Sequence, residues 1–285
     1  MEKIAIVMDS TAYLPDELTK ELNIRTVYLN IVIDGNSYKE VIDMPLDKYY
    51  DYLKDPNNSF PTTSQPAIGE VVSCLEKLKE EGYTDVIAIA LSSGISGTFS
   101  SYSVADLMVD GINVHPFDSE VACHPEGYYA IKAAMLIKEG KNSKEIMAAL
   151  DEMKKVSKAY FMADDLSHLQ RSGRLSGAQA VVGSLLQVKP LLHFDDKVIV
   201  PFQKIRTYKK VVSRMYELFD EYYRQHEGKH ITVCVLHVDA LDKAEEIKKY
   251  IEENYSNVTV DIDGISPVIS THLGLGAVAI GWTIL

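Results

Sequence analysis

The sequence contains few cysteines, with only Cys74, Cys123 and Cys234 among its 285 residues. The three lie far apart, their number is odd, and no CxxC pair is present. Neither a disulfide framework nor a zinc cluster is expected, because both need several cysteines at close or regular spacing. The scarcity fits a reducing compartment, and we expect a cytoplasmic protein.

Long hydrophobic runs and an excess of basic residues are also missing. No stretch approaches the roughly 18 apolar residues that indicate a membrane-spanning helix, and the apolar run Ile4–Met8 is too short for a secretory signal. Lysine and arginine number 29 against 41 aspartates and glutamates, which gives a formal net charge of −12. Nucleic acids and anionic membranes attract basic faces. We therefore expect no nucleic-acid partner and no stable membrane insertion.

The first half of the chain alternates between strand and helix patterns. Short apolar or β-branched runs predict strands, and the segments between them have helical periodicity. The predicted strands are Ile4–Met8, Ile24–Ile33, Val86–Leu91 and Ile112–Phe117. This rhythm predicts an α/β domain over residues 1–160, with a mainly parallel sheet flanked by helices.

The second half has a different pattern. Two β-rich runs, Lys189–Phe194 and Lys197–Phe202, flank Asp195-Asp196 and predict a hairpin. A long amphipathic helix is predicted over Thr207–Gln225, and further strands and helices follow. We expect a second domain, over residues 161–285, with a mixed α+β sheet.

The most informative loop is Ser92-Ser93-Gly94-Ile95-Ser96-Gly97-Thr98. It follows a predicted strand and precedes a predicted helix, and ligands of open α/β sheets bind at such strand ends. Glycines allow a close approach of the backbone, and a helix N-terminus favours an anion. The loop therefore suits a phosphate or a carboxylate, although a plain helix cap would explain the same residues.

Two other segments offer polar groups. Thr62-Thr63-Ser64-Gln65-Pro66 places hydroxyls before a predicted helix, where they would either bind an anion or cap the helix. His272 stands beside Gly274 and Gly276, and it would be either a structural histidine or a donor to a bound acid. The hydroxyl-bearing strand ends Asp9-Ser10-Thr11 and Asp118-Ser119 complete the set.

Several catalytic and cofactor motifs are absent. The sequence has no P-loop and no metal-binding histidine spacing, and we expect no cofactor. Gly94-Ile95-Ser96-Gly97-Thr98 departs from the GxSxG nucleophile elbow, which requires glycine at position 98. A serine hydrolase with Ser96 as nucleophile, His272 as base and Asp118 as the orienting acid remains an alternative to a binding protein.

Taken together, the polar segments resemble the DegV family. The matching strings occur in the family's order and span most of the chain. They are Asp9-Ser10-Thr11, Thr63-Ser64-Gln65-Pro66, Leu91 to Thr98, Asp118-Ser119, Arg171-Ser172-Gly173-Arg174, Lys189-Pro190 and His272-Leu273-Gly274-Leu275-Gly276.

The resemblance implies a two-domain protein that binds a long-chain fatty acid between its domains and has no catalysis of its own. It implies that Thr63 and Ser96 hold the carboxylate and that His272 lies near the head group. The remaining ligand-binding residues that we expect are Ser93, Gly94 and Gly97. Some family members are the FakB subunit of bacterial fatty acid kinase and present the acid to a catalytic subunit in lipid metabolism. By the same resemblance, Arg171 and Arg174 are expected to contact that partner.

The energetics agree with a fatty acid. About 14 CH₂ groups of a C16 tail, at roughly 0.8 kcal/mol each, contribute on the order of 11 kcal/mol when buried. The carboxylate then needs hydrogen bonds, and a protonated His272 would strengthen them. Apolar residues for a tunnel are expected in Ile68–Leu75, Leu166–Leu192 and Ile265–Leu285, including Ala178, Ala180, Val181, Val182, Leu185 and Leu186.

Overall fold

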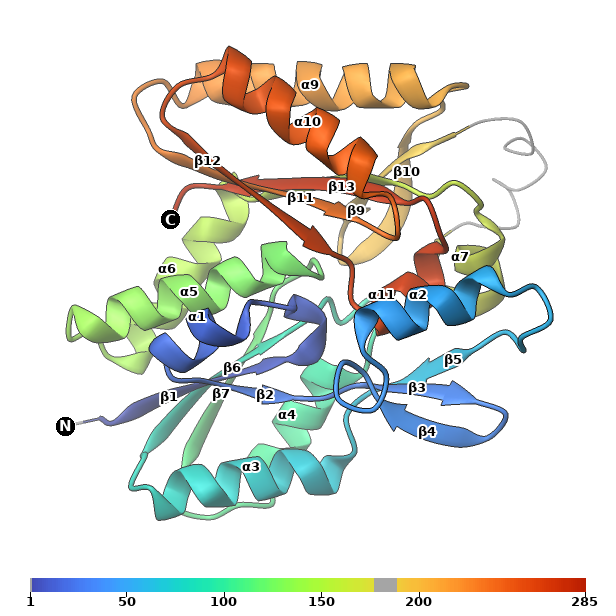
Figure 1. Ribbon diagram of the computed structural model, residues 1–285. Coiled ribbons are helices and arrows are strands. Elements are labelled where there is room, and N and C mark those ends of the chain that lie inside the picture. The colour runs from blue at the N-terminus through green and yellow to red at the C-terminus, as the bar shows by residue number, and fades with distance from the viewer. Residues whose placement is uncertain (1, 177–188) are drawn as a thin grey trace.

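The computed structural model describes residues 2–176 and 189–285, and it contains a parallel sheet, a mixed sheet and a small antiparallel sheet (Figure 1). The parallel sheet has the strand order β2-β1-β6-β7, and all its neighbouring strands run in the same direction. Its strands are β1 (Ile4–Asp9), β2 (Ile24–Val27), β6 (Asp85–Ala90) and β7 (Asn113–Asp118). The predicted parallel sheet of the N-terminal half is confirmed.

The mixed sheet comes from the C-terminal half and has the order β10-β9-β8-β13-β11-β12. Strands β11 and β12 are parallel, and the other neighbours are antiparallel. Its strands are β8 (Lys158–Met162), β9 (Leu191–Asp195), β10 (Val198–Gln203), β11 (Ile231–His237), β12 (Val258–Gly264) and β13 (Val278–Thr283). The predicted hairpin is β9–β10. The division of the chain at residue 160 stays a prediction.

Helices cover the outer faces of both large sheets and fill the space between them (Figure 1). Two helices, α3 (Ile68–Glu80) and α4 (Thr98–Asp106), cover the outer face of the parallel sheet. The outer face of the mixed sheet packs against α9 (Tyr208–Gln225) and α10 (Leu241–Asn254). Helix α5 (His124–Lys138) contacts strands of both sheets. Helix α6 (Ser143–Val156) packs on α5, and α1 (Asp16–Glu21) lies beside β2.

A third group of elements surrounds the C-terminal ends of the parallel strands. It includes the small sheet of β3 (Asn30–Ile33), β4 (Asn36–Lys39) and β5 (Thr62–Ser64). It also includes the 3₁₀ turn η1 (Ser10–Ala12) and the helices α2 (Leu46–Lys54), α7 (Ser167–Ser172) and α11 (Pro267–Leu273). Helix α11 contacts α2, α7, β3 and β5, so it joins the C-terminal half to this group.

The structure differs from the sequence-based expectations at three places. The predicted strand Ile24–Ile33 is two strands in different sheets, because the chain leaves β2 before Tyr28 and enters β3 at Asn30. The hydroxyls of Thr62–Ser64 do not cap a helix; they belong to β5, which pairs with β3. The segment Ile265–Leu285, in which no helix was predicted, contains helix α11, with Pro267 in its first turn.

Other boundaries follow from local chemistry that the sequence displays. Asn142 caps α6 in a reciprocal capping box with Glu145. Thr207 caps α9 through a hydrogen bond from the backbone N–H of Lys210. Within the described residues, no helix has both the length and the apolar character needed to cross a membrane.

Candidate ligand-binding site

A cavity of about 270 Å³ lies between the two large sheets and the group of elements around α11. Its walls come from both halves of the chain and are mostly apolar, with Leu29, Phe161, Phe194, Ile265 and Leu273 among them. The polar groups of the wall include Thr63, Ser96, Gly97, Arg174 and His272, which we call the polar cluster. An apolar cavity with a few polar groups is the usual form of a small-molecule site.

Two members of the polar cluster are in direct contact although 209 positions separate them in sequence. Strand β5 presents Thr63 and helix α11 presents His272, and their atoms Thr63 Oγ1 and His272 Nε2 are 2.8 Å apart. The other imidazole nitrogen, Nδ1, is buried and has no hydrogen-bond partner among the residues that the structure describes. A buried N–H without a partner is costly, which favours the tautomer with the proton on Nε2. In that tautomer His272 donates to Thr63, and the hydroxyl proton of Thr63 remains available for a ligand.

Burial determines the ionisation of His272. Burial, the nearby Arg174 cation and His168 lower the pKa of His272 to about 3. The imidazole is therefore neutral at neutral pH, and it does not supply the charge assistance that a protonated His272 would give. The sequence shows the histidine but not its surroundings, which determine its charge.

Arg174 supplies the positive charge of the polar cluster. Helix α7 ends at Gly173, whose positive φ of 71° turns the chain back toward the cavity. The Arg174 guanidinium donates to the carbonyl oxygens of Ile95, at 3.4 Å, and Ser172, at 2.5 Å. Arginine stays charged in proteins, so this group can pair with an anion at any physiological pH.

Arg171 faces a different environment from Arg174. Its side chain is exposed, and its guanidinium lies 5.1 Å from the centre of the Phe60 ring. The structure therefore separates the two arginines that were both predicted to contact a partner. Arg171 lies at the surface, whereas Arg174 lines the cavity.

Ser96 and Gly97 belong to the loop that precedes α4. Ser96 Oγ lies 2.9 Å from Thr98 Oγ1 and accepts a 3.3 Å hydrogen bond from the backbone N–H of Thr98. Gly97 packs so closely on the side chain of Gln65 that a Cβ atom at position 97 would overlap it. Gln65 also lines the cavity and was not among the predicted ligand-binding residues. Its place two residues after Thr63 in the Thr-Ser-Gln-Pro string is the signal that could have found it.

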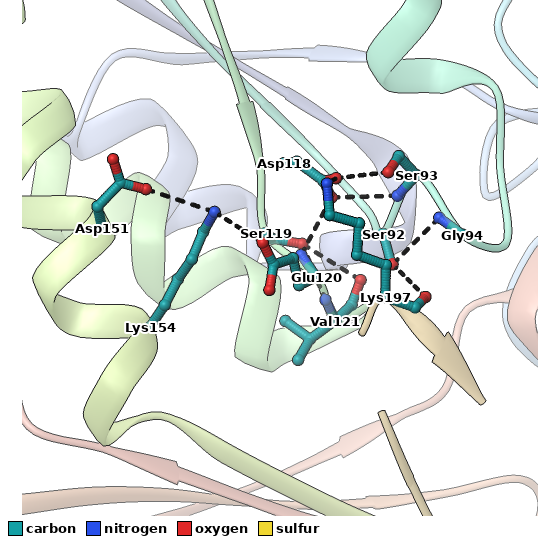
Figure 2. A network of polar contacts seen from close by, with 10 residues as sticks. All are labelled: Ser92, Ser93, Gly94, Asp118, Ser119, Glu120, Val121, Asp151, Lys154 and Lys197. Carbon is teal, nitrogen blue, oxygen red and sulfur yellow. Dashed lines mark hydrogen bonds and ion pairs between the residues drawn. The ribbon is translucent and has the colours of Figure 1, made fainter. Parts of the chain in front are cut away.

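Ser93 and Gly94 do not line the cavity, because the first half of the loop is bound to other elements (Figure 2). Ser93 donates through its N–H and its hydroxyl to Asp118, at 3.1 and 2.5 Å. Gly94 packs against the Lys197 carbonyl in the β9–β10 turn. Lys197 also pairs with Asp118 at 3.1 Å, and Ser92 donates to the Lys197 carbonyl oxygen at 2.6 Å. This network joins the loop to the mixed sheet.

The predicted hydrolase triad is not assembled. Burial raises the pKa of Asp118, but hydrogen bonds from Ser93 and the Lys197 ammonium outweigh this effect, so the pKa is below its usual value. The Asp118 carboxylate accepts hydrogen bonds from Ser93 and from the backbone N–H of Glu120, and it forms an ion pair with Lys197. His272 is not among its partners. Ser96 pairs with Thr98, and His272 pairs with Thr63. A general base must contact its nucleophile and be oriented by the acid, which is not the case here.

The predicted tail-binding residues have different outcomes. Ala178, Ala180, Val181, Val182, Leu185 and Leu186 lie outside the described residues. Helix α3 packs on the parallel sheet through Val71 and Leu75, and Ile68–Leu75 contributes nothing to the cavity wall. The other two predicted segments do contribute, through Leu169, Ile265 and Leu273. Phe161 in β8 and Phe194 in β9 also line the cavity and were not predicted. No group of three or more metal-binding side chains is found in residues 2–176 and 189–285, and nothing points to a cofactor.

The sequence profile of a family described as "Uncharacterised protein, DegV family" matches residues 3–284. The chain belongs to the DegV family. "Protein DegV" of Bacillus subtilis is 51% identical over 280 residues, which cover 98% of each protein. The resemblance drawn from the strings of polar residues is thereby confirmed.

Solved structures agree with this membership. The crystal structure of "DegV, a fatty acid binding protein from Bacillus subtilis" matches with a TM-score of 0.94 and 49% identity, over 100% of both chains. A structure described as "Fatty Acid Binding of a DegV family Protein from Thermus thermophilus" matches with a TM-score of 0.91 and 26% identity. It covers 99% of this chain and 100% of that one. The predicted two-domain α/β architecture of the family is confirmed.

Proposed function

We propose that this DegV-family protein binds a long-chain fatty acid, with the carboxylate at the polar cluster and the tail along the apolar cavity walls. The observation that carries the proposal is the meeting of Thr63, His272 and Arg174 at one cavity whose other walls are mostly apolar. The solved relatives described as fatty-acid-binding proteins support it.

The charge of the site suits a carboxylate. A buried carboxylate is stable only when it is paired and hydrogen-bonded. The Arg174 guanidinium offers the positive charge, and the Thr63 hydroxyl offers a hydrogen bond when His272 donates to its oxygen. Ser96 and the backbone around Gly97 lie at the same wall and supply further donors.

The apolar walls suit the tail. Burial of about 14 CH₂ groups contributes on the order of 11 kcal/mol, which exceeds an association cost that starts at about 4 kcal/mol. Binding therefore needs no covalent step. We propose that the chain itself performs no catalysis, which agrees with the unassembled Ser96, His272 and Asp118.

The test of the site compares two pairs of substitutions. Thr63→Ala with Ser96→Ala should weaken palmitate binding at least about tenfold, because each removed hydroxyl takes a hydrogen bond from a charged group. The matched control is Thr62→Ala with Ser100→Ala, which removes exposed hydroxyls next to the same positions. Isothermal titration calorimetry measures both. Equal affinity of the folded double variant and the control would refute the site.

We further propose that the protein works in the cytoplasm and delivers the acid to a separate kinase, which makes an acyl phosphate for lipid metabolism. The exposed position of Arg171 supports a role in that contact. Arg174 lines the cavity, so we assign it to the carboxylate and propose only Arg171 as a partner contact.

Arg171→Glu tests the kinase contact. We expect unchanged palmitate binding and strongly reduced acyl phosphate formation in a reconstituted assay with a fatty acid kinase catalytic subunit. Arg206→Glu makes the same charge change at another exposed arginine and serves as the control. If both variants support phosphorylation equally well, Arg171 does not contribute to the partner contact.

A further inference from the structure

Helix α11 forms part of the cavity wall but has no cap from its own segment. Four of its residues, including Val268 and His272, line the cavity. Ser266 occupies the N-cap position without making a capping hydrogen bond, and Pro267 has no N–H. Val268 therefore carries the first free N–H of the helix, which needs an acceptor.

That acceptor comes from the other end of the chain. Val268 donates to Glu40 Oε2 at 2.9 Å across 228 positions of sequence. The Glu40 side chain is fully buried, and its Oε1 accepts a 2.5 Å hydrogen bond from the Ser10 hydroxyl. Ser10 Oγ in turn accepts from the backbone N–H of Leu29, which also lines the cavity. Glu40 thus joins α11 to a second part of the cavity wall.

The hydrogen-bond directions match an ionised Glu40. The Ser10 hydroxyl donates to one carboxylate oxygen of Glu40, and the backbone N–H of Val268 donates to the other. Both carboxylate oxygens therefore act as acceptors. The partial positive charge at the start of α11 favours the same anionic form. A proton on Glu40 would compete with these donors and loosen the connection.

The surroundings of Glu40 bring the pKa of its carboxyl group close to neutral pH. Burial raises the pKa of Glu40 to about 7, while hydrogen bonds from Ser10 and Val268 counter part of the rise. Acids, phenols and a thiol from several elements interact electrostatically with Glu40 and disfavour its charged form. These described residues are Asp9, Glu126, Tyr13, Tyr28, Tyr49 and Cys123.

We propose that Glu40 is a positioning residue for the ligand site: its carboxylate holds the start of α11 in place, and loss of its charge weakens fatty-acid binding. The inference rests on the proposed function and adds a residue that does not contact the ligand. Glu40 acts through the helix rather than through its field at the head group. The neighbours that lower the pKa of His272 are Arg174 and His168, whereas Glu40 bonds to the opposite end of α11.

The experiment measures the palmitate dissociation constant from pH 6 to pH 8.5 for the wild type and for Glu40→Gln. Gln keeps the shape but has no charge. We expect the variant to bind about tenfold more weakly at pH 8.5, the effect of losing one charge-assisted hydrogen bond. The ratio of the two constants should fall toward one near pH 6, where wild-type Glu40 is protonated. Glu81→Gln, at an exposed carboxylate paired with Arg25, should match the wild type at every pH.

Other outcomes separate the two proposals. If the wild type does not bind palmitate, the proposed function fails; if it binds and the ratio stays constant across pH, the role of Glu40 fails alone. A constant ratio above one would indicate a merely structural residue. If Glu40→Gln does not fold, Ser10→Ala is measured in its place. Removal of the Ser10 donor must raise the pKa of Glu40 and so move the midpoint of the pH profile of palmitate binding upward. An unmoved midpoint would overturn the proposal.

Discussion

His272 illustrates how single residues acquire their chemistry from burial and neighbours. Its position in the chain can be predicted from the His-Leu-Gly-Leu-Gly string, but its neutral state depends on burial and on Arg174, which is 98 positions away. Arg174 itself resembles Arg171 in sequence, and only the turn at Gly173 directs it into the cavity. Glu40 belongs to no sequence motif, because its hydrogen-bond partners Ser10 and Val268 are distant from it in the sequence.

Glu40 also predicts a pH dependence of stability. Its pKa is raised from 4.5 to about 7 by burial, so between these values the folded state binds a proton that the unfolded state releases. The free energy of unfolding should fall as pH rises through this window, by on the order of 3 kcal/mol for a shift of this size. Urea denaturation at pH 5 and pH 8 measures it, and the fall should be smaller in Glu40→Gln. An equal fall in both proteins would contradict the assignment.

At the scale of elements, strands and helices with strong local signals could be predicted, and those set by tertiary pairing could not. The buried run of β6 and the capped helix α9 lie close to their predicted positions. Strand β5 has only three residues and exists because β3 pairs with it. Helix α11 is short and is capped by Glu40 from outside its own segment, so its local sequence does not predict a helix.

The contact between the Ser92–Thr98 loop and the β9–β10 turn gives a prediction at this scale. Gly94→Ala would push a methyl group onto the backbone carbonyl of Lys197, which cannot move aside freely. We expect a loss of about 1–3 kcal/mol in the free energy of unfolding. Gly69→Ala is the matched control, since its methyl group meets nothing within 4 Å and alanine is the better helix former in α3. A Gly94→Ala protein as stable as this control would show that the contact does not constrain the loop.

At the scale of the whole molecule, the candidate site exists only because two halves of the chain meet. Thr63 and Ser96 come from the N-terminal half, and Arg174 and His272 from the C-terminal half. The order of strands and helices predicts two sheets, but it does not say which of their faces meet. The family resemblance supplied that information, and the matching solved structures agree with it over the full chain. No sequence motif marks the apolar wall from β8 and β9. In the sequence Phe161 and Phe194 look like ordinary core residues, and only the three-dimensional structure shows that they line the cavity.

The central claim is that the cavity holds one fatty acid, and native mass spectrometry of the purified protein tests it most directly. The account predicts an added mass equal to one C16 or C18 fatty acid per chain, which is lost on denaturation and recovered in a lipid extract. The Thr63→Ala with Ser96→Ala protein should carry much less of it than the Thr62→Ala with Ser100→Ala control. A wild-type protein that is empty when purified, and that stays empty after incubation with palmitate and oleate, would contradict the account.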